Sequence, residues 1–95
     1  MDLSIVIPVY NEEKNVALLH QTIRNTLDNT KFKYEIIFVD DGSTDSTFNI
    51  LNNLKKVKII KFRKNFGQTA AMVAGFKEAK GSVIVSMDGD LQNDP

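Results

Sequence analysis

Four short apolar runs alternate along the chain with three stretches whose apolar residues recur at helical spacing. The runs cover residues 3–9, 34–39, 58–62 and 82–87. The first, second and fourth are nearly continuous in β-branched and other apolar residues, which is typical of strands buried on both faces of a parallel sheet. The third run carries Lys58 and Lys61 among its apolar residues. This pattern predicts an edge strand with one solvated side.

The stretches between the runs predict three helices. The first has apolar residues three or four positions apart, at Val16, Leu19, Ile23 and Leu27. Asn11 is its expected N-cap, because acidic residues follow in what would be the first turn. A second helix is expected after Ser43 or Thr44. A third, rich in small residues, is expected from 67 to 80, with Gly81 ending it.

The order βαβαβαβ predicts an α/β fold. Right-handed crossovers make it an open, doubly wound, mostly parallel sheet, with the strands in the order 3-2-1-4 when numbered along the chain. In such sheets ligands bind outside the carboxyl ends of the strands, where the strand order reverses. That point lies between the first and fourth strands. Polar segments follow every strand at this edge, at 8–12, 40–45, 63–68 and 88–90.

Carboxylates dominate two of these segments. Asp40 or Asp41 can accept a hydrogen bond from a base imide or a ribose hydroxyl; a role in a turn or a helix cap is the alternative. Asp88 and Asp90 suit an oxygen-preferring cation such as Mg²⁺ or Mn²⁺, although a tight Asp-Gly turn would explain the pair if it stood elsewhere. No glycine-rich phosphate loop follows the first strand. We therefore expect a metal ion to hold any phosphate.

Composition narrows the choice of function. The formal net charge is zero, which argues against a nucleic-acid-binding protein. Disulfides and thiolate zinc sites are excluded, because the chain has no cysteine. The apolar runs are too short to span a membrane.

Three motifs carry a family resemblance. Residues 4–12, 39–45 and 88–92 resemble family 2 glycosyltransferases, whose catalytic domain has the GT-A fold with a Rossmann-like nucleotide-binding half. Residues 63–71 and 91–95 are most similar to the polyprenyl-phosphate branch. That branch includes dolichol-phosphate mannosyltransferases and undecaprenyl-phosphate sugar transferases.

The resemblance implies an inverting transfer of a sugar from a UDP- or GDP-linked donor to a lipid phosphate. By position, the residues that it implies for nucleotide-sugar binding are Pro8, Tyr10, Asn11, Glu12, Asp40, Asp41, Lys64, Gln68 and Asp88. Asp88, Asp90 and Gln92 would hold Mg²⁺ or Mn²⁺. Residues 1–95 would be the nucleotide-sugar-binding part of the catalytic domain, truncated after the metal motif. The acceptor site would then lie beyond Pro95, with the whole enzyme at the cytoplasmic face of a membrane.

Other functions remain open at this point. The chain could bind a nucleotide-sugar without turnover, or belong to a family 2 transferase that acts on a sugar hydroxyl in polysaccharide or cell-wall synthesis. A signalling receiver would need an acidic pair after the first strand, and a sugar nucleotidyltransferase a glycine-rich loop there; both are absent. The unpaired edge of the fourth strand favours self-association.

Overall fold

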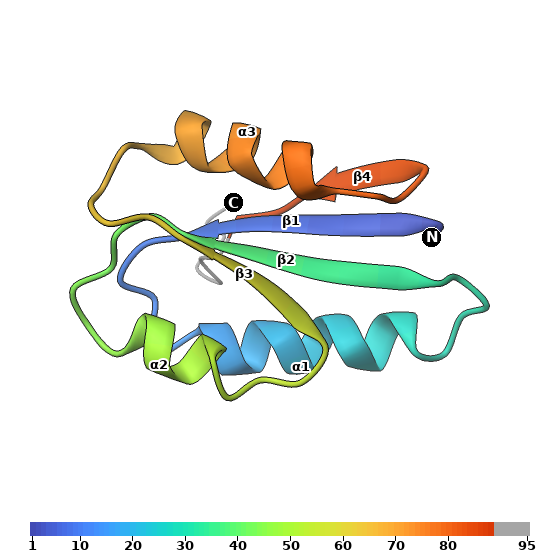
Figure 1. Cartoon of the computed structure of the whole chain (residues 1–95). Coiled ribbons are helices and arrows are strands. Elements are labelled where there is room, and N and C mark those ends of the chain that lie inside the picture. Colours follow the sequence, from blue (N-terminus) through green and yellow to red (C-terminus); the bar gives the residue numbers. More distant parts are fainter. Residues whose placement is uncertain (89–95) are drawn as a thin grey trace, which may run out of the picture.

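A computed structural model describes residues 1–88 as a single parallel sheet between two layers of helices. Its elements in chain order are β1 (Leu3–Val9), α1 (Val16–Leu27), β2 (Tyr34–Asp40), α2 (Thr47–Leu51), β3 (Val57–Lys61), α3 (Gln68–Glu78) and β4 (Val83–Ser86). The strands lie in the order β3-β2-β1-β4, and each pairs in parallel with its neighbours. Helix α3 covers one face, and α1 and α2 cover the other (Figure 1). The predicted fold class and strand order are confirmed.

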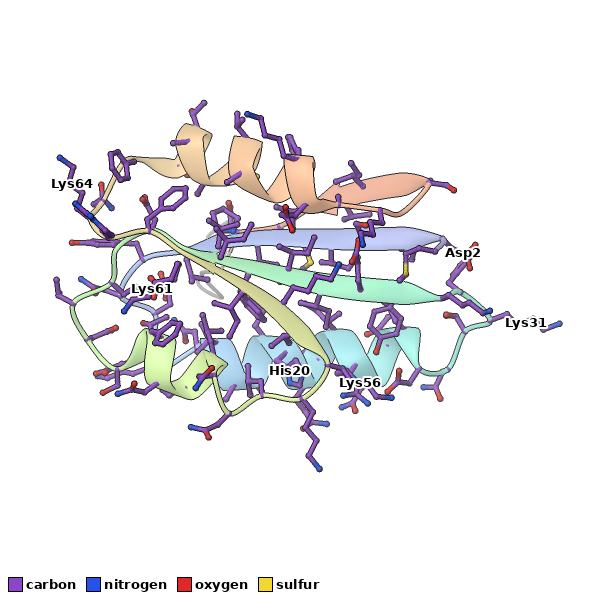
Figure 2. All side chains as sticks on the ribbon, in the orientation of Figure 1. Asp2, His20, Lys31, Lys56, Lys61 and Lys64 are labelled. Atoms are coloured by element: carbon purple, nitrogen blue, oxygen red, sulfur yellow. The ribbon has the colours of Figure 1, made fainter. Side chains whose placement is uncertain are left out.

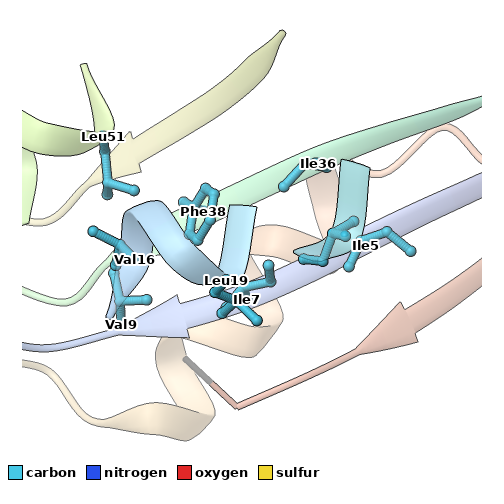
Figure 3. Packing of buried hydrophobic residues seen from close by; sticks show 9 residues of the cluster. Ile5, Ile7, Val9, Val16, Leu19, Ile36, Phe38 and Leu51 are labelled. Atoms are coloured by element: carbon cyan, nitrogen blue, oxygen red, sulfur yellow. The ribbon is translucent and has the colours of Figure 1, made fainter. Parts of the chain in front are cut away.

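The two central strands form the core because their side chains alternate between the two helical layers. On one face, residues of β1 and β2 pack against α1 and α2 (Figure 3); the buried cluster is Ile5, Ile7, Val9, Val16, Leu19, Ile23, Ile36, Phe38 and Leu51. On the other face, Val6, Ile37 and Val39 pack against Ala71 of α3. Helix α3 approaches closely because Gly75 lacks a Cβ, which would lie 2.3 Å from Val6 Cγ1.

Strand β4 differs from the sequence prediction. It was expected to be buried on both faces, but Val83 and Ile84 are 54% and 43% exposed. Within residues 1–88, β4 is one of the two edge strands and pairs with β1 alone. Helix α3 packs over β1 and β2 rather than over β4. An apolar strand sequence thus identifies the strand, while its burial depends on which elements lie over it.

The helix ends were also predicted imperfectly. Helix α1 begins at Val16 with Asn15 at its N-cap position, so the prediction of Asn11 as N-cap is wrong. Helix α3 ends at Glu78, before Gly81. Gly81 instead allows a close approach between chain segments, because a Cβ there would lie 2.6 Å from the backbone carbonyl carbon of Leu3. No helix within residues 1–88 is long and apolar enough to cross a membrane.

The sequence did not predict a buried carboxylate that lies near the amino ends of the strands. Glu35 of β2 accepts hydrogen bonds from the Ser4 hydroxyl and, at 2.7 Å, from the Lys80 backbone N–H. Its other oxygen lies 2.9 Å from Lys58 Nζ. Ser4 Oγ in turn accepts a hydrogen bond from the Gly81 N–H. The network ties the α3–β4 connection to β1, β2 and β3.

This network should make stability depend on acid pH. Burial by itself raises the pKa of Glu35, but Ser4, Lys58 and the Lys80 N–H outweigh it and lower the pKa from 4.5 to about 2. Because the folded pKa is depressed, its contribution of about 3 kcal/mol is complete above pH ~4.5 and is lost as the pH falls towards 2. Urea unfolding should show that loss in the wild type and not in Glu35→Gln. Glu78→Gln, at an exposed position, is the matched control. A pH dependence that is the same in all three proteins would contradict this role for Glu35.

Candidate functional site

A pocket of about 300 Å³ opens at the carboxyl ends of the strands, where the strand order reverses. Its lining residues are Pro8, Val9, Tyr10, Glu12, Asp41, Gln68 and Asp88. They come from the ends of β1, β2 and β4 and from the start of α3. The structure thus brings together six of the nine residues predicted to bind a nucleotide-sugar, and adds Val9. What they bind remains a prediction.

The other three predicted residues do not line the pocket. Asp40 is fully buried beneath the site, where its Oδ1 accepts a hydrogen bond from the Ser43 N–H at 2.9 Å. Asn11 turns its side chain away to accept a hydrogen bond from the Thr44 N–H at 2.8 Å. Lys64 lies in the exposed β3–α3 loop, at the outer end of the molecule (Figure 2). Asp40 and Asn11 are next in sequence to residues that line the pocket, but their side chains make other contacts. A sequence motif does not reveal this difference.

Asp41 organises one wall of the pocket. Its carboxylate accepts hydrogen bonds from the Phe66 N–H at 2.8 Å, the Gly67 N–H at 3.0 Å and Asn65 Nδ2 at 3.1 Å. These bonds fix the loop that leads into α3. Asp41 nevertheless lines the pocket, although the residue is only 4% exposed. The structure thus shows a loop-holding role for Asp41, and its contact with a base or ribose stays a prediction.

A second part of the pocket lining is held by hydrogen bonds between two loops. The Asn11 N–H donates to Ser43 Oγ and the Glu12 N–H donates to Thr47 Oγ1, both at 2.9 Å. Asp45 accepts hydrogen bonds from Thr47 and from the Glu13 N–H. Burial tends to raise the pKa of Asp45, but the Thr47 bonds lower it below its ordinary value. The segment that carries Tyr10 and Glu12 is thereby held in place, and Tyr10 stays 44% exposed beside the pocket.

Asp88 supplies an exposed carboxylate to the pocket. Its Oδ1 accepts a hydrogen bond from Gln68 Nε2 at 3.3 Å. Carboxylate oxygens are ligands that Mg²⁺ and Mn²⁺ prefer, so the donor type fits such an ion. Within residues 1–88 no three acidic or histidine side chains cluster as a metal site. The predicted ligands Asp90 and Gln92 lie outside the described residues.

Comparison with known proteins identifies the family of this chain. Residues 4–95 match the model of "Glycosyl transferase family 2". The chain is 44% identical over 102 residues to the dodecaprenyl-phosphate galacturonate synthase of Rhizobium johnstonii. The alignment covers the whole chain and 30% of that protein. This similarity confirms the predicted resemblance to polyprenyl-phosphate sugar transferases.

Solved structures agree with the fold. TarS 1-349 from S. aureus, in complex with UDP-GlcNAc, has a TM-score of 0.77 and 30% identity over 95% of this chain and 27% of that chain. Glucosyl-3-phosphoglycerate synthase from Mycobacterium tuberculosis, in complex with Mn²⁺, UDP and glucosyl-3-phosphoglycerate, has a TM-score of 0.76. Its identity is 25%, over 97% of this chain and 34% of that chain.

The chain therefore spans about a third, or less, of the length of these similar proteins. Over that length the sequence match is nearly continuous, and the sheet superposes on the GT-A fold. This chain belongs to glycosyl transferase family 2.

Proposed function

We propose that residues 1–95 form the nucleotide-sugar-binding part of an inverting, metal-dependent glycosyltransferase. The donor is a UDP- or GDP-linked sugar and the acceptor is a polyprenyl phosphate. The observation that carries the proposal is the pocket at the switch point, which gathers Tyr10, Asp41 and Asp88 from the ends of three strands. The two similar structures were solved with UDP-GlcNAc and with UDP and Mn²⁺, which supports a nucleotide diphosphate in this pocket.

Each wall of the pocket has a distinct role in the proposal. The exposed ring of Tyr10 stacks on the base, an interaction that every base allows. Asp41 accepts a hydrogen bond from the base or ribose. Asp88, together with Asp90 and Gln92, would hold Mg²⁺ or Mn²⁺, and Gln68 orients the Asp88 carboxylate through its hydrogen bond. When bound, such an ion neutralises negative charge on the departing nucleoside diphosphate.

The acceptor is inferred from chemistry and from similarity. A phosphate monoester has a second pKa of about 6, so it is largely dianionic near neutral pH and attacks without a strong protein base. A sugar hydroxyl would need a carboxylate base. The 44% identical relative is named for a dodecaprenyl phosphate, which favours a lipid phosphate. We place the reaction at the cytoplasmic face of a membrane, where such an acceptor is embedded.

Turnover tests this proposal. An enzyme that carries residues 1–95 together with its acceptor-binding part is incubated with Mn²⁺, a UDP- or GDP-sugar, and either a short-chain polyprenyl phosphate or the matching polyprenol. Release of nucleoside diphosphate that depends on the phosphate is the expected result. Metal-dependent binding of the nucleotide without turnover would show a non-catalytic binding module. Transfer to an added sugar, without the lipid phosphate, would indicate a polysaccharide-synthesising relative.

A further inference from the structure

We infer that the site selects uracil over guanine, because the Asp41 carboxylate has one acceptor position left for a base. The inference rests on the proposed function, in which Asp41 meets the base. It goes further, since the family resemblance leaves the nucleotide open.

The acceptor positions of Asp41 can be counted from its contacts. Each carboxylate oxygen accepts about two hydrogen bonds. Oδ2 already accepts one from the Gly67 N–H at 3.0 Å and one from Asn65 Nδ2 at 3.1 Å. Oδ1 accepts one, from the Phe66 N–H at 2.8 Å. One position on Oδ1 remains, on a residue that lines the pocket.

The three donors are held firmly by the surrounding structure. Two are backbone N–H groups of the loop that enters α3. The Phe66 ring packs edge-to-face on Phe62, with the ring centroids 5.6 Å apart. The Asn65 side chain also donates to the Asp41 backbone carbonyl, at 3.2 Å. A ligand would therefore have to break the loop in order to free Oδ2.

The two bases make different demands on a carboxylate. Uracil offers a single ring N–H, at N3, which the free position on Oδ1 can accept. Guanine offers two adjacent donors, N1–H and N2–H, which both oxygens of a carboxylate would have to accept together. Here the second N–H would enter the pocket without an acceptor on Asp41. Leaving a buried donor unpaired weakens binding by about 10- to 100-fold.

Calorimetric titration with Mn²⁺ tests the inference on the full chain, using UDP, GDP and the diphosphate of 3-methyluridine. The methylated compound keeps the ring, ribose and diphosphate but lacks the N3–H. We expect UDP to bind most tightly and the other two about 10- to 100-fold more weakly. Equal or tighter binding of GDP, or full affinity of 3-methyl-UDP, would overturn the inference while the proposed function stands. Failure of all three to bind would overturn both.

A variant distinguishes two causes of weak GDP binding, the lack of a free acceptor position on Asp41 and general damage to the loop. Asn65→Ala removes one donor from Oδ2 and leaves both backbone donors in place. The freed acceptor should serve guanine, so the ratio of GDP to UDP dissociation constants should fall towards one. General damage would weaken both nucleotides alike. An unchanged ratio would therefore contradict the role given to the occupied Oδ2.

Discussion

Replacing Gly42 by alanine is expected to cost about 2–5 kcal/mol of stability and to abolish nucleotide binding. Gly42 follows Asp41 directly and has a positive φ of 75°. An alanine Cβ would lie 2.2 Å from the Lys64 carbonyl carbon and 2.4 Å from the Asn65 nitrogen. Because both are backbone atoms, the two loops would have to separate, and the hydrogen bonds to Asp41 would break. Urea unfolding and UDP titration measure the two effects.

Gly67→Ala is the matched control for this substitution. Gly67 also has a positive φ, of 104°, but nothing lies within 4 Å of the Cβ position. This variant therefore has backbone strain, of about 1–3 kcal/mol, without steric overlap between the new Cβ and a neighbouring loop. If Gly67→Ala loses as much stability and binding as Gly42→Ala, crowding between the loops is not the cause.

Asp88→Asn is expected to remove the metal-dependent part of UDP binding. The amide keeps the size of the side chain and an oxygen for Gln68 Nε2, but it loses the negative charge that a divalent ion requires. The affinity for UDP in the presence of Mn²⁺ should fall at least about 10- to 100-fold. This is the effect of removing an outer-shell partner of a metal ligand. Titrations of UDP with Mn²⁺ and with a chelator measure it. Asp90→Ala should have the same effect.

Glu78→Gln controls for the change in net charge. It also removes one negative charge, but from the last residue of α3, which is exposed and does not line the pocket. Its UDP affinity should respond to Mn²⁺ as the wild type does. If Asp88→Asn also keeps the full response to Mn²⁺, Asp88 is not a metal ligand in this chain.

Some of this arrangement could be predicted because it depends on local pattern and general topology. The apolar runs identified β1 and β2, and right-handed crossovers then allowed few strand orders. Once the order was set, the segments around Tyr10, Asp41 and Asp88 had to meet at one edge. No alignment was needed for that step, because the carboxyl ends of parallel strands point the same way.

The remainder depends on side-chain direction and on contacts between distant segments. Asp40 and Asp41 are adjacent in sequence, yet only Asp41 lines the pocket. Asp40, the last residue of β2, is fully buried and accepts a hydrogen bond from the Ser43 N–H. The partners of Glu35 lie 23 to 45 positions away along the chain, which local pattern does not reveal. A polar residue early in a strand gives no sign that it will be buried.

The most direct test of the proposed site is ¹H–¹⁵N NMR of the chain with Mn²⁺, because this paramagnetic ion broadens the signals of nearby amides. With UDP present, we expect broadening at Tyr10, Glu12, Gln68 and Asp88. The signals of Lys33 and Tyr34, at the other end of the sheet, should stay sharp. Asp88→Asn should abolish the effect. Broadening that needs no UDP, or that centres on the amino ends of the strands, would contradict a metal-dependent nucleotide site at the switch point.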